Sequence, residues 1–469
     1  MVKIVRRLIG NVRPSCRPSL PAVRTCEWVS IQHSFSPKPG NMRDPRIQPA
    51  RGMEPMKTDS NLRINGPRLW SSLMEMARIG ATPKGGVNRL TLTDLDRDSR
   101  DLFAKWCREA GCTITIDKVG SMFARRKGAD DSLPPVMVGS HLDTQPTGGK
   151  FDGALGVMAA LEIVRTLNDL DVTTRHPIEI AMWTNEEGSR FAPAMTASGV
   201  FTGVLTLEDS LKVKDIDGKE FGAELARIGY AGEAAVGGRP VAAFFELHIE
   251  QGPILEEEGI DIGIVTAANG QKWYEITLTG VESHAGPTPM NRRKDALLGG
   301  ARIIDLINQI GHVHDPSACA TCGMIQAYPN SRNVIPGQVF LTVDFRHPDG
   351  AKLDSMDTAL RKGVAEIAAK TGLTYTMGMV QNYPPMPFDA ACVDAVRRAA
   401  KTLCYSAREI TSGAGHDAVF MARVAPTAMV FTPCVGGISH NEAEDMTPAW
   451  AAAGTNVLIH AVLEKAGIV

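Results

Sequence analysis

The sequence contains no apolar run long enough to cross a bilayer and no marked excess of either charge. A membrane-spanning helix needs about 20 consecutive apolar residues, so we expect no membrane span. Lys plus Arg number 50 and Asp plus Glu number 52, which gives a formal net charge of -2. This balance does not favour the basic surface that nucleic acid or an anionic membrane requires. We therefore expect a soluble protein that acts on a small molecule, with no nucleic-acid or membrane partner.

Cysteines are also few and scattered. The nine cysteines are an odd number and lack the dense spacing of a disulfide scaffold. This pattern favours a reducing compartment, and the cytoplasm is the expected location. Cys319 and Cys322 form a CxxC motif, but no second pair follows at the spacing of a zinc ribbon. We expect them to be ordinary buried thiols.

Acidic residues are absent before Glu27, whereas basic residues recur from Lys3 to Arg24. This bias resembles an organellar transit peptide and gives an alternative location. The other reading is a start codon assigned too early, because Met42, Met53 and Met56 precede the first periodic segment. In either case residues 1–59 are expected to be disordered, since they are rich in Pro, Arg and Ser and lack apolar periodicity.

Three widespread catalytic motifs are missing: HExxH, GxSxG and GxxxxGK[ST]. Their absence disfavours thermolysin-type zinc proteases, serine hydrolases with a nucleophile elbow, and P-loop enzymes.

Predicted strands alternate with predicted helices through most of the chain. A length of 469 residues exceeds what one hydrophobic core normally organises, which favours two domains. Apolar residues at helical spacing predict helices at 69–79, 94–110 and around 157–167. Apolar or β-branched runs predict strands at 136–138, 178–183, 241–245 and 427–431. This alternation predicts an α/β fold whose catalytic domain has a mostly parallel sheet with helices on both faces.

The pattern changes between residues 253 and 381. It predicts a β-α-β-β-α-β order with elements at 273–278, 294–310, 323–327, 339–345, 353–370 and 373–379. This order is the α+β ferredoxin-like arrangement. Motifs that carry chemistry flank it on both sides, so we expect an inserted domain at 253–381 within a discontinuous metal-binding catalytic domain at 60–252 and 382–469. The expected hinges are 252–259 and 380–388.

Several potential metal ligands follow predicted strands: His141, Asp152, Glu186, Glu187, His248 and His440. The carboxyl ends of parallel strands meet at one edge of a sheet, so distant ligands can converge there. Imidazole nitrogen and carboxylate oxygen suit zinc and similar ions, and two ions about 3.5–4 Å apart need a bridging ligand. Each short motif is common by chance, but their coincidence after successive strands predicts a two-metal hydrolase.

Spacing also suggests roles for individual carboxylates. Asp152 lies in a glycine-rich turn with the freedom to aim between two ions, and is the candidate bridge. Asp143 stands two residues after His141 and can accept the second imidazole N–H from outside the ligand set. Adjacent residues in an extended segment point in opposite directions. One of Glu186 and Glu187 can therefore bind metal while the other acts as general base. We assign Glu186 as the base, although spacing alone also permits the reverse.

Six motifs resemble the signatures of the M20 metallopeptidase-like amidohydrolases, in the branch of N-carbamoyl-L-amino acid hydrolase, β-ureidopropionase and allantoate amidohydrolase. The motifs are GSHLDTQPTGGKFDG, TNEEGSRFAPAM, HIEQGP, SHAGPTPM, DFRHPD and GAGHDA. The resemblance extends from about residue 61 to the C-terminus. The peptidase branches usually carry an acid where His248 stands here.

This resemblance implies specific roles for the candidate residues. One ion would be held by His141, Asp152 and His248, and the other by Asp152, Glu187 and His440. Glu186 would be the general base, which settles the order of the glutamate pair. The inserted domain resembles a dimerisation lid, and His284 resembles a histidine that stabilises the tetrahedral intermediate in the partner subunit. A homodimer is therefore implied.

Substrate contacts are implied at Gln251, Asn333, Arg346 and Gly415. An arginine fork binds a carboxylate through two parallel hydrogen bonds, so Arg346 favours a substrate with a carboxylate. His416, next to Gly415, can support its loop or contact substrate.

The leading hypothesis is a binuclear amidohydrolase that converts an N-carbamoyl amino acid to the amino acid, ammonia and carbon dioxide. N-carbamoyl-β-alanine and N-carbamoyl-L-amino acids differ by one methylene, worth about 1–3 kcal/mol, so the motifs do not separate them. The alternatives are an allantoate amidohydrolase, an M20-type dipeptidase or aminopeptidase, and a catalytically silent binding or dimerisation protein. Two divalent ions per subunit are expected, with zinc as the default and manganese, cobalt or nickel as alternatives.

Overall fold

The computed structural model describes residues 61–469, and the expected extension at 1–59 lies outside the described residues. The larger of the two main sheets has nine strands in the order β1-β2-β4-β3-β5-β16-β6-β14, with β15 paired to β6. Its strands are β1 (Thr113–Ile116), β2 (Met122–Arg126), β3 (Val136–His141), β4 (Ile178–Trp183), β5 (Ala243–Ile249), β6 (Ile262–Ala268), β14 (Met386–Pro387), β15 (Ala407–Ser412) and β16 (Thr427–Thr432).

The centre of this sheet is parallel: β3 pairs in parallel with β4 and β5, and β5 with β16. Every residue of these four strands is buried, which explains why they appear in the sequence as continuous apolar runs. β2 and β6 join the parallel centre in antiparallel orientation.

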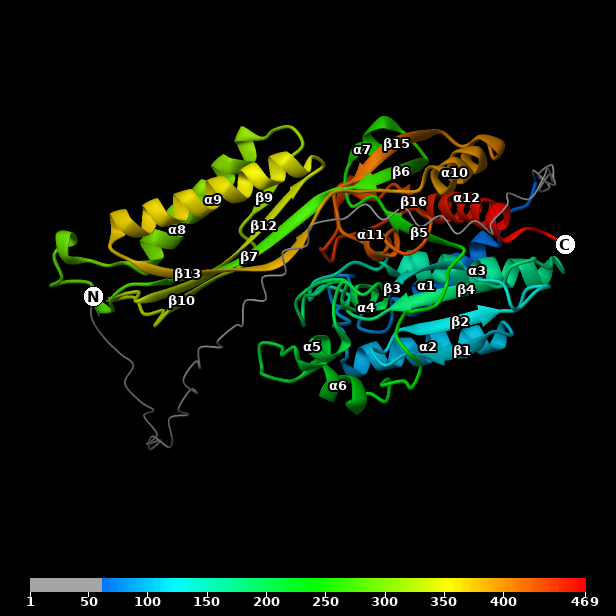
Figure 1. The fold of residues 1–469 in the computed structure, drawn as a ribbon, viewed down its shortest axis with the longest axis horizontal. Coiled ribbons are helices and arrows are strands. Elements are labelled where there is room, and N and C mark those ends of the chain that lie inside the picture. Colours follow the sequence, from blue (N-terminus) through cyan, green and yellow to red (C-terminus); the bar gives the residue numbers. More distant parts are fainter. Residues whose placement is uncertain (1–60) are drawn as a thin grey trace, which may run out of the picture. The chain divides into compact units, whose positions relative to one another are not determined.

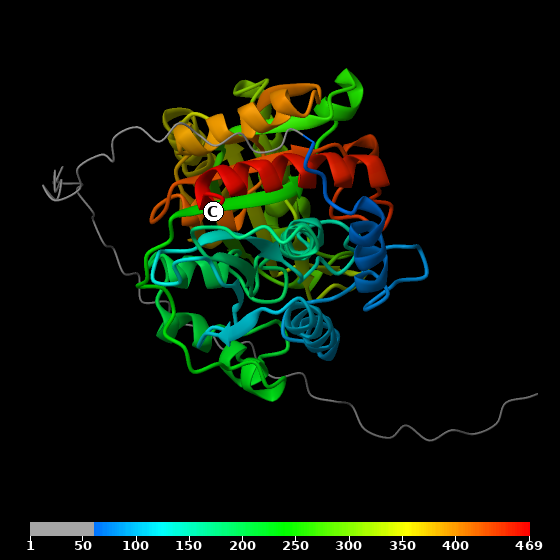
Figure 2. The same ribbon diagram turned by 90° about the vertical axis from the view of Figure 1, so that its right-hand side faces the viewer.

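Helices pack on both faces of the larger sheet. The helices in the part of the chain that forms this sheet are α1 (Gly66–Met76), α2 (Asp94–Glu109), α3 (Ala154–Asp169), α4 (Thr196–Phe201), α5 (Leu207–Lys212), α6 (Phe221–Arg227), α7 (Ile254–Glu258), α10 (Ala390–Thr402), α11 (Asp417–Met421) and α12 (Pro448–Ala466). α10 and α12 run side by side, orange and red in Figure 2, and both contact β16. α11 contacts the strands β5 and β16 and the helix α4.

The smaller sheet has the strand order β10-β12-β7-β13, with β9 paired to β12. Its elements are β7 (Gly270–Thr279), α8 (Ala296–Val313), β9 (Cys319–Thr321), β10 (Ile325–Tyr328), β12 (Gln338–His347), α9 (Gly350–Thr371) and β13 (Thr374–Tyr383). α8 and α9 lie along this sheet (Figure 1) and contact its strands. Asp295 and Asp349 cap these helices by accepting backbone N–H bonds.

The predicted fold class is confirmed: a mostly parallel α/β sheet with helices on both faces accompanies an α+β ferredoxin-like unit. Each sheet has its own hydrophobic core. A further two-stranded sheet joins β8 (Ser283–His284) to β11 (Val334–Ile335). No helix within residues 61–469 is long and apolar enough to cross a membrane.

Two details differ from the sequence expectations. The inserted segment was expected to begin at residue 253, but β6 pairs with β15 and β16 and so belongs to the larger sheet. The smaller sheet begins at Gly270. Cys319 and Cys322 were expected to be buried, but Cys319 is exposed and Cys322 only partly buried, because Cys319 begins the short edge strand β9 and Cys322 follows it.

Candidate metal centre

Four adjacent strands bring the predicted ligands to one edge of the larger sheet. β4, β3, β5 and β16 are neighbours and parallel, so their carboxyl ends lie together. His141 is the last residue of β3, and His248 lies near the end of β5. Glu186 and Glu187 follow β4, and His440 follows β16. This convergence is the one that the sequence predicted.

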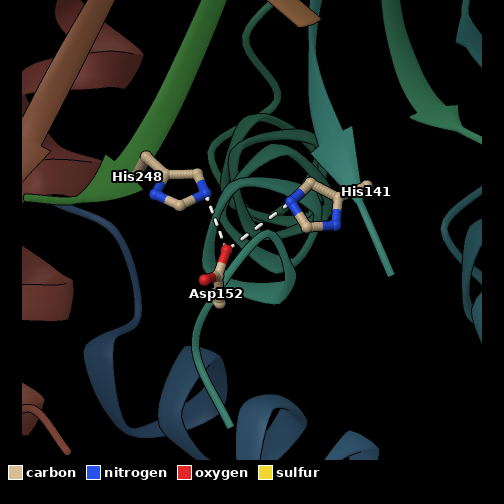
Figure 3. Close-up of side chains that lie close together, drawn as sticks. All are labelled: His141, Asp152 and His248. Carbon is tan, nitrogen blue, oxygen red and sulfur yellow. Dashed lines mark ion pairs between the residues drawn. The ribbon is translucent and has the colours of Figure 1, made fainter. Parts of the chain in front are cut away.

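His141, Asp152 and His248 form the first group of potential ligands (Figure 3). Both imidazoles face one carboxylate oxygen: His248 Nε2 is 3.2 Å and His141 Nε2 is 3.6 Å from Asp152 Oδ1. All three residues are buried.

The second group shares Asp152 and adds Glu187 and His440. His440 Nε2 lies 3.5 Å from Asp152 Oδ2 and 3.3 Å from Glu187 Oε2. Asp152 thus turns a different oxygen toward each group, which is the geometry of a bridging carboxylate. The His440 side chain is 50% exposed, so this second group opens toward solvent.

The turn after Asp152 depends on glycine. Gly153 has a φ of +64°, and a Cβ there would lie 2.4 Å from the His141 ring. A side chain at this position would therefore displace the imidazole from Asp152. Gln251 Nε2 and Ser439 Oγ donate hydrogen bonds of 2.8 and 2.7 Å to Asp152 Oδ2 and fix its orientation.

Asp143 contacts the site differently from the prediction. The partner of His141 Nδ1 at 2.9 Å is the backbone carbonyl of Asp143, whereas the Asp143 carboxylate lies 3.8 Å away. That carboxylate instead accepts the backbone N–H groups of Glu186 and Glu187 at 3.3 and 3.2 Å. Asp143 therefore orients both the His141 ring and the glutamate pair from outside the ligand groups.

Burial and mutual repulsion perturb the acids of the site. Burial raises the pKa of Glu186 well above its usual value, and the carboxylates of Asp417 and Glu187 raise it further. Burial and the Asp152 carboxylate do the same to Glu187. A divalent cation between these oxygens would offset the repulsion.

The histidines of the first group have opposite pKa shifts. Burial lowers the pKa of His141 to about 4 and keeps its imidazole neutral, as a metal ligand must be. Burial acts in the same direction on His248, but the hydrogen bond and charge of Asp152 outweigh it and raise its pKa to about 9. Metal binding at this group would therefore displace a proton from His248.

The donor set and its spacing fit a divalent metal. The candidate donor atoms within each group lie within 4.8 Å of one another. Metal–ligand bonds of about 2.0–2.1 Å in tetrahedral geometry place neighbouring donors about 3.3 Å apart. The separations of 3.2 and 3.6 Å from Asp152 Oδ1 bracket that value.

A cavity of about 200 Å³ opens over both groups. Of the predicted substrate residues it brings together Gln251, Arg346 and Gly415, and it is also lined by Glu186. His416, whose role the sequence left open, lines the cavity too. Its ring centroid is 4.5 Å from that of His248, and its Nε2 lies 3.0 Å from Ser412 Oγ, so it supports the His248 imidazole.

His284 and Asn333 do not line this cavity. His284 ends β8 and Asn333 directly precedes β11, and the backbone N–H of Ala285 donates to the Asn333 carbonyl. Both side chains are exposed.

Sequence reasoning missed Glu444, which is buried beside Asp152. Its Oε1 accepts the backbone N–H groups of Phe151 and Asp152 at 2.9 and 3.0 Å, and its Oε2 accepts Ser439 Oγ at 2.9 Å. Glu444 therefore links the turn that carries Asp152 to the loop that carries His440. An acid four residues after a ligand histidine was the available signal. Gln145, which donates to Glu187 Oε2 at 2.7 Å, gave none.

Comparison with known proteins agrees with this geometry. An N-carbamoyl-L-amino-acid amidohydrolase of Rhizobium meliloti is 54% identical over 409 residues, covering 87% of this chain and 98% of that protein. One from Geobacillus stearothermophilus is 37% identical, covering 86% and 99%. The crystal structure of an amidase of the hydantoinase/carbamoylase family from Burkholderia vietnamiensis superposes with a TM-score of 0.86 at 62% identity, covering 87% and 99%.

The family predicted from the motifs is thereby confirmed. The sequence profile described as peptidase family M20/M25/M40 matches residues 137–464, which include both groups of potential ligands and the smaller sheet. The chain belongs to the M20/M25/M40 peptidase family.

Proposed function

We propose that this protein is a binuclear metal-dependent amidohydrolase that hydrolyses N-carbamoyl-L-amino acids. The observation that carries the proposal is one cavity lined by members of both ligand groups, by Glu186 and by the guanidinium of Arg346. It thus combines groups suited to hydrolysis with a group suited to a substrate carboxylate.

His141, Asp152 and His248 would hold one ion, and Asp152, Glu187 and His440 the other. Zinc is the default metal, and manganese, cobalt and nickel suit the same donors. Bound divalent ions supply Lewis acidity, which polarises a carbonyl and makes water more acidic.

Glu186 is positioned to move the proton. As water adds to the ureido carbon, its carboxylate takes one proton from that water and later delivers it to the leaving nitrogen. The C–N bond breaks, and the resulting carbamate yields carbon dioxide, so that the final products are the amino acid, ammonia and carbon dioxide. The hydrogen bond from the backbone N–H of Glu186 to the Asp143 carboxylate fixes the backbone position from which this side chain extends.

Gln251 and Arg346 are the proposed substrate-binding side chains of the cavity. Gln251 Oε1 is buried and has no hydrogen-bond partner among the described residues, so it can accept an N–H of the ureido group. Arg346 lies across the cavity as a partner for the carboxylate. Gly415 leaves the cavity wall without a side chain.

The relatives named for N-carbamoyl-L-amino acids favour α-amino acid substrates over N-carbamoyl-β-alanine. A panel of N-carbamoyl-L-amino acids, N-carbamoyl-β-alanine, allantoate and dipeptides, assayed with added zinc, manganese, cobalt or nickel, tests this order. We expect the fastest turnover with an N-carbamoyl-L-amino acid. If every ureido compound remains intact with every metal, the proposal is wrong, and turnover of dipeptides alone would identify a peptidase.

We further propose that residues 270–383 form an inserted lid and dimerisation domain, with His284 completing the partner's site. The exposed His284 and Asn333, placed together but away from their own chain's cavity, support this arrangement. Mixed dimers of Glu186→Gln and His284→Ala chains should recover about a quarter to a half of the activity that each homodimer lacks, because one intact composite site remains. A monomer in solution, or no recovery on mixing, would contradict it. The cytoplasmic location stays a prediction.

A further inference from the structure

A continuous series of hydrogen bonds connects Arg346 to the loop that follows Glu186 and Glu187. Its centre is Gln271, a buried residue near the start of β7. In the strand register, Gln271 stands opposite Arg346 on β12 and opposite Tyr383 on β13. Gln271 therefore contacts both neighbouring strands of the smaller sheet. The inference drawn from Gln271 rests on the proposed function.

Toward the substrate side, Gln271 holds the acid that orients Arg346. Gln271 Nε2 lies 3.3 and 3.4 Å from the two carboxylate oxygens of Asp344. Asp344 accepts from Arg346 Nη2 at 2.8 Å and from Nε at 3.1 and 3.2 Å. Arg346 Nη1 donates to the Gly413 carbonyl at 3.2 Å. Each terminal nitrogen of Arg346 keeps one further N–H for a substrate carboxylate.

Toward the catalytic side, Gln271 reaches the loop after the glutamate pair. Gln271 Oε1 accepts Gln381 Nε2 at 3.2 Å, and Gln381 Oε1 accepts the backbone N–H of Ala194 at 3.2 Å. The next residue, Met195, donates its backbone N–H to the Glu186 carbonyl at 2.7 Å. The series thus ends on the backbone of the proposed general base.

Tyr383 provides a second connection to the cavity wall. Its hydroxyl donates to Gln271 Oε1 at 2.5 Å. A Cβ on Gly415 would lie 2.2 Å from this hydroxyl, so the absence of a side chain there is what lets Tyr383 reach Gln271. Gly415 therefore serves this contact as well as the shape of the cavity.

We propose that Gln271 is a positioning residue that couples the carboxylate-binding Arg346 to the loop carrying Glu186. Occupation of Arg346 by substrate would restrain Asp344, and through Gln271 and Gln381 it would favour one position of that loop. Substrates without a carboxylate at the right distance would then lose turnover rate as well as affinity.

The chemistry of the position requires an amide. Its nitrogen donates to a carboxylate while its oxygen accepts from a hydroxyl and from a second amide. A glutamate would keep the acceptor but would place a like charge against Asp344. A methionine has similar length and supports none of these bonds, which leaves the buried polar groups of Tyr383 and Gln381 without their acceptor.

The first test compares Gln271→Met with Gln338→Met, an exposed glutamine on β12 that serves as the matched control. Loss of these hydrogen bonds should raise KM about tenfold and lower kcat about tenfold, with metal content unchanged. Gln381→Met interrupts only the catalytic side, so it should lower kcat while KM stays within about twofold. The control should leave both parameters unchanged. Wild-type values of both parameters in Gln271→Met would overturn the proposal.

A double-mutant cycle separates coupling from a general loss of structure. In an Arg346→Lys background, Gln271→Met should lower kcat/KM by less than about threefold, because the group on which it acts is already displaced. The same large loss in both backgrounds would show independent effects and contradict the coupling.

Exchanging the charges provides a second variant if Gln271→Met does not fold. Gln271→Glu should raise KM, and adding Asp344→Asn should bring KM back by at least about threefold, because donor and acceptor are exchanged. No recovery would count against the proposal. The Kd of N-carbamoyl-L-alanine, measured by calorimetry through the same cycle with Glu186→Gln added to every variant, reports the coupling without turnover. Absence of turnover in the unchanged protein would refute only the proposed function.

Discussion

Replacing Glu186 with Gln tests whether its proposed role in proton transfer is separate from metal binding. The substitution keeps the side-chain volume and the backbone N–H that Asp143 accepts. Glu186 Oε2 lies 3.5 Å from His141 Nε2, at the margin of the first ligand group, and Glu186 lines the cavity. The variant should therefore fold and keep its ions while losing the group that accepts the proton.

The size of the effect follows from the role. General base catalysis contributes about 10²–10⁴-fold, equivalent to about 3–5 kcal/mol of the barrier, and kcat should fall by that factor. Glu187→Gln is the matched comparison, because its carboxylate lies 3.3 Å from His440 Nε2 and belongs to the second group. That variant should lose one ion as well as activity.

Steady-state kinetics on an N-carbamoyl-L-amino acid, with metal content measured by plasma mass spectrometry after gel filtration, distinguishes the two roles. Normal turnover by Glu186→Gln with two bound ions would refute the assignment. Loss of an ion from the Glu186 variant, with full metal content in the Glu187 variant, would show that the roles are reversed.

Two further predictions concern the stability of the protein and the turn that carries Asp152. Burial raises the pKa of Asp117 from 3.8 to about 7, although its Oδ1 accepts the backbone N–H groups of Val119 and Ser121. Because the folded pKa lies above the unfolded one, the protein should lose about 2–3 kcal/mol at this group between pH 5 and pH 8. Urea unfolding of Asp117→Asn should show a smaller loss over that range, and an equal loss would contradict the reasoning. Gly153→Ala should reduce bound metal, because its Cβ would lie 2.4 Å from the His141 ring; full metal content in the purified variant would count against the described turn.

The parallel centre of the fold was predictable because burial on both faces leaves a clear local signal. β4 coincides with the predicted strand at 178–183, and β16 begins at the predicted residue and extends to Thr432. The edge strand β1 and its neighbour β2 were not predicted. Their burial is incomplete, and β1 alternates between exposed and partly buried residues, so they lack a continuous apolar run. β6 was also not predicted, although its first four residues are buried and its partners β15 and β16 belong to the larger sheet.

Residue types predicted the candidate ligands better than they predicted the contacts around them. Strand ends located His141, His248 and the glutamate pair without knowledge of any distance. They did not reveal that the carbonyl of Asp143, and not its carboxylate, accepts from His141. Such a choice depends on backbone angles after the strand. An acid four residues after His440 marks Glu444 as a candidate, but that local pattern does not encode its contact with the turn at Asp152, 292 positions away.

The two sheets separate the groups suited to hydrolysis from a group suited to substrate selection. All candidate metal ligands and Glu186 come from segments around the larger sheet, whereas Arg346 and Asp344 lie on β12 of the smaller one. A site divided in this way can bind a carboxylate without catalysis unless something connects the parts. Direct hydrogen bonds connect the two parts of the site at two places, from Arg346 to the Gly413 carbonyl and from the Ala194 N–H to Gln381. Because Gln271 bonds to Gln381 and to the acid that holds Arg346, a change at this residue should alter substrate preference and turnover together.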